Sequence, residues 1–186
     1  MKELSLNILD ITENSVKANA QNIKITINET DKVLEISIED DGYGMDAEML
    51  KNVTDPFCTT RTTRKVGMGI PLFKLAAEQT GGSFEIASKD IKNYPDEHGT
   101  KTYAKFLKNN IDFTPLGDII STITTLIQGS PHIDFYFAHY YSDKEVSIDT
   151  KTIREILGDE VSLSDYEVIK WIESSLKDEY AQFSLR

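Results

Sequence analysis

Two side chains with complementary chemistry stand four residues apart near the start of the chain, the carboxylate of Asp10 and the amide of Asn14. Residues at this spacing lie on one face of a helix, one turn apart. There the carboxylate can polarise an attacking water or hydroxyl, and the amide oxygen can bind Mg²⁺, a hard cation that prefers oxygen ligands. Taken alone, such a pair is more often the polar edge of an amphipathic helix.

An acidic, glycine-containing turn follows at Asp40-Asp41-Gly42-Tyr43-Gly44. A carboxylate at the end of a strand, here Asp40, can accept a hydrogen bond from an exocyclic amine. The two glycines would let the backbone approach a flat ring closely. Gly99-Thr100 forms a second turn before a strand, and its hydroxyl can bind a purine or a bridging water. Each turn by itself is equally compatible with a plain connection.

The segment Lys65-Val66-Gly67-Met68-Gly69-Ile70 has the composition of an anion-binding helix start. Glycines expose backbone N–H groups there, and the N-terminus of a helix attracts negative charge. Arg61, Arg64 and Lys65 add positive charge suited to phosphate. The Rossmann fingerprint and the P-loop pattern are both absent, so these two kinds of nucleotide site are not predicted.

Hydrophobic periodicity places these segments on an alternation of helices and strands. Leu4, Ile8, Ile11 and Ser15 fall on one stripe of a helix over residues 3–18. Alternating side chains over residues 22–28 and 34–38 predict a hairpin of two strands. Further helices are expected over residues 46–53, 69–80, 115–128, 150–157 and 164–180, and further strands over residues 84–87, 100–107, 133–141 and 146–148.

Several helix starts are assigned from capping residues. Asp46 and Thr150 are expected to cap the helices that they precede. Ser164 and Glu167 match a capping box. Pro115 is expected to open a helix, because proline is tolerated in the first turn.

The charge of the chain limits the choice of partners. The net charge is −11, and it is uneven, with 14 basic and 17 acidic residues over residues 1–108 against 6 and 14 over residues 109–186. Such an excess of acid argues against general binding of nucleic acid, which requires cations for the phosphates. A nucleotide pocket needs only a few local cations and remains compatible.

The sequence also limits the compartment and the metal chemistry. No apolar run approaches the roughly 20 residues that a membrane helix needs, and the first residues carry acids where a signal peptide would be apolar. We therefore expect a cytoplasmic protein without a membrane partner. Cys58 is the single cysteine, which excludes an intrachain disulfide, and the three histidines show no metal-ligand spacing.

Taken together, the segments resemble the ATPase domain shared by DNA gyrase B, Hsp90, histidine kinases and MutL, the GHKL superfamily. Their order along residues 1–108 carries the resemblance: LDITENSVKANAQNIKI, DDGYGM, DPFCTTR, KVGMGIPLFK and HGTKTYAKF. The resemblance implies an α/β (α+β) two-layer sandwich of the Bergerat type, with a mixed β-sheet and helices on one face. Residues 109–186 would form a small, acidic C-terminal α/β extension, either packed on the first domain or docking a partner.

The resemblance also implies roles for individual residues in binding ATP and Mg²⁺. Asn14 would ligate the metal, and Asp40 would accept a hydrogen bond from adenine N6. The adenine pocket would be completed by Ala18, Gly42, Gly44, Met45 and Thr100. The phosphates would lie against the second glycine segment beneath a lid at about residues 57–66, a group that comprises Phe57, Thr59, Thr60, Arg61, Lys65, Val66, Gly67, Met68 and Gly69.

The catalytic base is where the chain departs from the pattern. Hydrolytic members and anti-sigma kinases carry a Glu four residues before the metal-binding Asn, whereas this chain has Asp10, one methylene shorter. Glu13 lies about 100° away around the helix, so Asp10 is the preferred base. The shorter side chain puts the rate of the chemistry in doubt rather than the binding.

Three functions remain open on the sequence. The first is a Mg²⁺-dependent phosphotransferase or ATPase that acts with a protein partner, either as a stand-alone protein similar to histidine kinase catalytic domains or as an anti-sigma-like serine kinase. The second is a non-catalytic, nucleotide-gated switch, and the third is a fold in which the glycine turns are only structural. The early position of Asn14 leads us to expect a stand-alone protein, and a homodimer is one candidate assembly.

Overall fold

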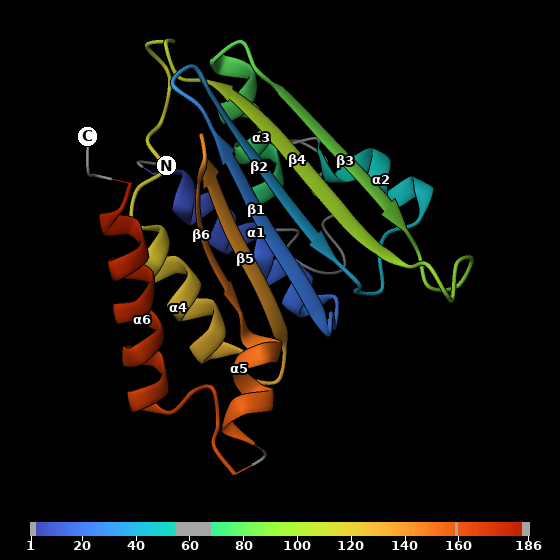
Figure 1. Ribbon diagram of the computed structural model, residues 1–186. Coiled ribbons are helices and arrows are strands. Elements are labelled where there is room, and N and C mark those ends of the chain that lie inside the picture. Colours follow the sequence, from blue (N-terminus) through green and yellow to red (C-terminus); the bar gives the residue numbers. More distant parts are fainter. Residues whose placement is uncertain (1–2, 55–67, 159, 184–186) are drawn as a thin grey trace.

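The computed structural model describes residues 3–54, 68–158 and 160–183. Six strands form one mixed sheet in the order β3-β4-β2-β1-β5-β6. Figure 1 shows the sheet with its helices gathered behind it. The strands are β1 (Asn22–Glu29), β2 (Val33–Asp40), β3 (Ser83–Lys89), β4 (Gly99–Leu107), β5 (Asp134–Tyr141) and β6 (Lys144–Asp149).

The helix layer covers one face of the sheet, as the two-layer prediction requires. α1 packs between α3 and α4, and α6 packs against α4 on the far side from α1. The predicted fold class is therefore confirmed. The helices are α1 (Leu4–Lys17), α2 (Ala47–Val53), α3 (Gly69–Gln79), α4 (Ile119–Gly129), α5 (Thr150–Leu157) and α6 (Tyr166–Ala181). None of the described helices has the length and apolar character to cross a membrane.

The period of two in the strands separates a buried face from an open face. Ile25 lies opposite Ile38 on β2 and Phe137 on β5, and all three are buried beneath the helices. On the open face, Lys24 lies beside Glu39 and Tyr136 in the same register. The hairpin predicted at residues 22–38 is confirmed, because alternation lets β1 and β2 bury one set of side chains together.

The acidic C-terminal residues continue the same sheet. β5 runs parallel to β1, β6 pairs antiparallel with β5, and α4 packs on α1. Phe135 and Phe137 of β5 are buried and thus form part of the hydrophobic core. The boundary placed at residue 108 stays a prediction.

The predicted start of α4 is wrong, and the error comes from a tertiary contact. α4 begins at Ile119 rather than at Pro115, and Asp118 caps it by accepting from Ser121 N–H at 2.9 Å. The carbonyl of Pro115 instead accepts a hydrogen bond from Leu4 N–H at 2.9 Å. Residues 115–116 therefore pair with the start of α1 and cannot join the helix.

The predicted capping residues of α5 and α6 are also wrong, whereas the cap of α2 is confirmed. Asp46 accepts from Met49 N–H at 2.8 Å and caps α2. Asp149 caps α5, because the hydroxyl of Thr150 accepts from Phe135 N–H at 2.7 Å and is occupied on β5. Ser164 does not form a capping box, since α6 begins at Tyr166 without a side-chain cap.

Candidate functional site

The carboxylate of Asp40 lies at the end of β2, on the side of the sheet that faces α1. Its Oδ2 accepts a hydrogen bond from Ser15 Oγ at 2.5 Å, and its Oδ1 accepts from Gly42 N–H at 2.9 Å. Burial raises the pKa of Asp40, while the hydrogen bonds from Ser15 and Gly42 oppose that rise. Asp40 is therefore a half-buried hydrogen-bond acceptor, and its orientation is fixed by Ser15 on α1 and by Gly42 in the turn after β2.

Gly42 lies directly against the end of α1. A Cβ at this position would be 2.8 Å from Ala18 Cβ. The next residue, Tyr43, donates its N–H to the Ala18 carbonyl at 2.8 Å. The predicted adenine turn is therefore held on the helix that carries Asp10 and Asn14, and Ala18 lies against Gly42.

Gly44 and Gly99 both make close contacts that a side chain would block. Gly44 has φ +67°, and a Cβ there would be 1.9 Å from the Lys89 carbonyl oxygen. A Cβ on Gly99 would be 2.0 Å from the Asp40 carbonyl oxygen. These contacts hold the Asp40–Gly44 turn against the end of β3 and the start of β4.

Ser88 on β3 joins the three parts of this turn region. Its Oγ accepts from Met45 N–H at 2.8 Å, donates to the Gly99 carbonyl at 2.9 Å and lies 2.9 Å from Thr100 Oγ1. His98 adds a further contact, between its Nδ1 and the Gly42 carbonyl, at 2.7 Å. Met45 and Thr100, both predicted site residues, therefore both contact the hydroxyl of Ser88.

Asp10 lies where α1 meets the start of α3. Gly69, the first residue of α3, packs so closely that a Cβ there would be 3.0 Å from Asp10 Cβ. Partial burial and the nearby Glu13 raise the pKa of Asp10, and Lys17 opposes the rise. Glu13 itself pairs with Lys17 at 3.3 Å. Of the two carboxylates, Asp10 is the one that faces the helix start.

The structure describes some of the remaining predicted site residues, and others lie outside the described residues. Asn14 is half-buried one turn after Asp10, and Met68 is exposed immediately before α3. Seven predicted residues of the phosphate region lie outside the described residues, namely Phe57, Thr59, Thr60, Arg61, Lys65, Val66 and Gly67. Their assignment to the nucleotide site stays a prediction.

Sequence reasoning missed Ser15, Ser88 and His98 as parts of the site. Ser15 carried a signal, since it stands on the apolar stripe of α1 and is only 4% exposed. A hydroxyl on a buried stripe needs a partner, and that partner is Asp40. Ser88 and His98 carried no such signal, because their partners come from elsewhere in the chain.

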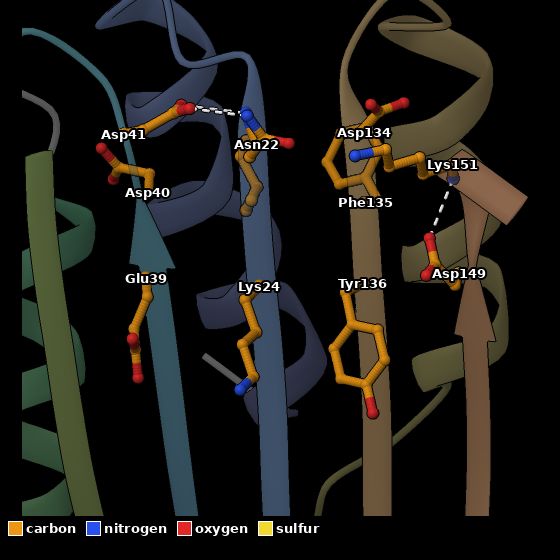
Figure 2. A pocket seen from close by; sticks show the side chains of 11 residues that line it. Asn22, Lys24, Glu39, Asp40, Asp41, Asp134, Phe135, Tyr136, Asp149 and Lys151 are labelled. Carbon is orange, nitrogen blue, oxygen red and sulfur yellow. Dashed lines mark hydrogen bonds between the residues drawn. The ribbon is translucent and has the colours of Figure 1, made fainter.

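Asp41 behaves differently from its neighbour Asp40. Its Oδ1 accepts from the N–H groups of Gln21 and Asn22 at 2.7 and 2.9 Å, and its Oδ2 accepts from the Asn22 amide at 2.7 Å. Figure 2 shows this contact among the residues that line a pocket. Asp41 thus fastens the start of β1, and these contacts together keep its pKa low against the effect of burial.

The pocket in Figure 2 has a volume of about 330 Å³ and includes side chains of the open face such as Lys24 and Tyr136. Its acids already have partners: Glu39 pairs with Lys101 at 2.8 Å, and Asp134 pairs with Arg154 at 3.0 Å. The Ser15–Asp40 contact is made toward α1, beneath the opposite face. Asp40 also lines this pocket, so the pocket adjoins the predicted adenine site at the end of β2.

An α/β domain with such turns at one end of its sheet has the architecture of a nucleotide-binding domain. Residues 2–124 match the model of a family described as "Histidine kinase-, DNA gyrase B-, and HSP90-like ATPase". The chain belongs to this family, and the predicted GHKL resemblance is confirmed. Membership of the family supports the binding of ATP.

Curated relatives match over about half of the chain. The chain is 28% identical over 91 residues to an NtrY-like sensor histidine kinase of Rickettsia bellii, covering 48% of this chain and 15% of the relative. It is 30% identical over 87 residues to the sensor histidine kinase ZraS of Escherichia coli K12, covering 46% and 18%. The chain thus spans less than a fifth of the length of these relatives.

Solved structures share the fold over most of the chain. The ATPase domain of Aquifex aeolicus MutL, complexed with ADP, has a TM-score of 0.57 at 13% identity, covering 84% of this chain and 69% of that one. The N-terminal domain of a DNA repair protein has a TM-score of 0.54 at 18% identity, covering 86% and 58%. These likenesses concern the fold alone.

Proposed function

We propose that the chain is a cytoplasmic, Mg²⁺-dependent enzyme that binds ATP and acts on or with a protein partner, as a phosphotransferase or an ATPase. The observation that carries the proposal is the carboxylate of Asp40, which Ser15 and Gly42 hold at the position predicted to contact adenine. The names of the curated relatives favour phosphotransfer, since both are sensor histidine kinases.

Adenine recognition rests on Asp40 in this proposal. A carboxylate has more acceptor positions than the hydrogen bonds that Asp40 already receives from Ser15, Gly42 and the Thr100 backbone, so it can also accept from the exocyclic amine of adenine. Gly42 and Gly44 provide a surface without side chains for the ring. The linked hydroxyls of Ser88 and Thr100 lie at the adjoining strand ends and can position a bridging water.

Asn14 is the residue that would hold Mg²⁺. Within residues 3–54, 68–158 and 160–183, no three His, Cys, Asp or Glu side chains are grouped to hold a metal. A single amide fits nonetheless, because Mg²⁺ is usually bound by one or two protein oxygens together with substrate phosphates. When bound, the ion would neutralise charge that develops on the phosphates.

Asp10 would act as the base. Its raised pKa favours proton acceptance, and its place beside Gly69 puts it next to the helix start predicted to receive the phosphates. The proton would pass from an attacking water, or from a hydroxyl of a partner, to an Asp10 carboxylate oxygen. Residues Lys65 and Gly67 are expected to contribute phosphate contacts as well.

The proposal is tested by ATP turnover and label transfer. The protein is incubated with Mg²⁺ and γ-labelled ATP, with and without cell lysate, and both free phosphate and labelled protein are measured. We expect Asp10→Asn to lower the rate about a hundredfold while the affinity for ATP stays nearly unchanged. Asn14→Ala is expected to weaken the dependence on Mg²⁺.

Glu13→Gln is the matched control, since Glu13 is exposed on the same helix and pairs only with Lys17 among the described contacts. Because Glu13 also helps to raise the pKa of Asp10, this variant should change turnover only slightly, and far less than Asp10→Asn does. If Asp10→Asn and Asn14→Ala turn over ATP at the wild-type rate, the catalytic assignment is wrong. Labelled protein would indicate a kinase, including a serine kinase of the anti-sigma type, and free phosphate would indicate an ATPase.

A non-catalytic switch is the second candidate, and the exposure of Asp10 favours it. The side chain is one methylene shorter than the Glu of hydrolytic relatives and is exposed to water. A switch predicts ATP binding that is lost in Asp40→Ala, together with no turnover in any condition. Calorimetry and the labelling experiment together separate the two functions.

A further inference from the structure

The two edges of the sheet differ in how they are covered. At one edge, Ser147 N–H on β6 donates to Glu179 Oε2 of α6 at 3.1 Å, so α6 reaches this edge. At the other edge, β3 pairs with β4 over seven residues, Ser83–Lys89. An edge strand directs alternate N–H and C=O groups outward, and β3 has no proline to interrupt them.

The open-face side chains of β3 have a self-complementary order. Glu85, Ala87 and Lys89 alternate along the strand, and all three are exposed. We propose that β3 pairs with β3 of a second copy of this chain, antiparallel and centred on Ala87. In this register Ala87 lies opposite Ala87 of the second copy, and each Glu85 lies opposite Lys89 of the other.

Cross-strand geometry supports this register. Side chains directly opposite each other in an antiparallel pair have Cβ atoms about 4.5 to 5.5 Å apart, and opposite charges at such positions attract. The small Ala87 at the axis leaves room for close approach. Lys89 already pairs with Glu97 at 2.6 Å, but both side chains are largely exposed, so exchanging that partner costs little.

The same pairing would also cover half-buried side chains on the opposite face of β3. Phe84 and Ile86 are only half-buried, although α3 and the short α2 both contact β3, because no further strand among the described residues pairs with β3. In the proposed register Ile86 faces Ser88 of the second copy, so its exposed edge is covered. Within β3 this register pairs only the five residues Glu85–Lys89, and such a short pairing predicts a transient dimer with an interface below about 1,200 Å².

The first test is disulfide trapping in a Cys58→Ser background. Ala87→Cys places two thiols opposite each other at the axis, at a separation close to what a disulfide spans. Ser83→Cys is the control, since it is exposed on the same strand but four residues from the axis. Under mild oxidation we expect at least about fivefold more covalent dimer from Ala87→Cys, on the basis of that spacing.

The second test reverses the charges. Glu85→Lys and Lys89→Glu should each weaken self-association in sedimentation at high protein concentration, because each places like charges opposite one another. The double variant E85K/K89E should restore it, whereas Glu97→Gln should leave it unchanged. Circular dichroism confirms that each variant is folded.

Two results would overturn the proposal. One is a wild-type chain that stays monomeric at all concentrations while Ala87→Cys gives no more covalent dimer than Ser83→Cys. The other is a double variant that associates no better than the single ones. Neither measurement uses ATP, so the result does not depend on the proposed function.

Discussion

Ser15 Oγ donates a hydrogen bond to Asp40 Oδ2 at 2.5 Å and so joins the middle of the helix layer to the end of a central strand. The contact fixes the orientation of the carboxylate and stabilises its charged form against partial burial. We expect Ser15→Ala to lower the affinity for ATP about tenfold, since hydrogen bonds to charged groups contribute about 1.5 to 3 kcal/mol. Isothermal titration calorimetry measures the change.

Ser174→Ala serves as the control for that variant, because Ser174 is exposed on α6. Its affinity for ATP should equal that of the wild type. An unchanged affinity in Ser15→Ala would mean that Asp40 does not need this contact to bind the nucleotide.

As the pH is lowered, the affinity for ATP should begin to fall at a higher pH than it would if Asp40 had the pKa of an exposed aspartate. Burial raises the pKa of Asp40, so its carboxylate takes up a proton at a higher pH than an exposed one. The protonated group accepts hydrogen bonds more weakly. Titrations with ATP across the acidic range should show this decline.

Asp40→Asn removes the carboxylate that titrates, so it separates the effect of Asp40 on ATP binding from its effect on the stability of the fold. The folded-state pKa lies above the unfolded one, so proton uptake favours the folded state. That contribution is present below the unfolded pKa and is lost as pH rises through the folded pKa. We therefore expect Asp40→Asn to bind ATP weakly at neutral pH yet to unfold at no lower urea concentration than the wild type. A marked loss of stability would contradict this account.

Gly44→Ala should destabilise the fold by at least about 2 kcal/mol, through the cost of a left-handed backbone and a clash. The residue has φ +67°, and its Cβ would lie 1.9 Å from the Lys89 carbonyl oxygen. Urea unfolding gives the change. Gly129→Ala is the control, since Gly129 ends α4 with nothing within 4 Å of its Cβ position, and it should be neutral or stabilising.

Tyr180→Phe should destabilise the fold by about 1 to 3 kcal/mol, because it leaves a buried ring nitrogen without its partner. His139 is 2% exposed; its Nδ1 lies 2.8 Å from the Tyr180 hydroxyl, and its Nε2 lies 3.0 Å from Glu29 Oε2. Burial raises the pKa of the Tyr180 phenol. Thermal unfolding measures the loss, and Tyr166→Phe on the exposed side of α6 should cause none.

Most of the helices and strands followed from local pattern. The period of two in Ile23, Ile25 and Ile27 predicted a half-buried strand, because one face of the sheet meets the helices and the other meets water. The predicted helix starts failed where a side chain or carbonyl was engaged elsewhere, as with Pro115 and Thr150. A capping preference is weak, and a single tertiary hydrogen bond overrides it.

The residues of the candidate site divide in the same way, into those that the sequence suggested and those that only the structure brought to the site. Asp10, Asn14, Asp40 and the two glycines of the acidic turn could be proposed from the sequence, since their types and order carry the resemblance, and their roles stay predictions. Ser88 and His98 could not be proposed, because each contacts a turn more than 40 residues away in the chain. Chain connectivity does not reveal such contacts.

The sequence by itself therefore determined the family and the two-layer fold, because these depend on residue type and local periodicity. Only the tertiary structure decided that Ser15 holds Asp40, that Ser88 links Met45 to Thr100, and that residues 134–149 continue the sheet beside β1. Each of these depends on which distant segments pack together, and packing is set by the whole core rather than by any one segment.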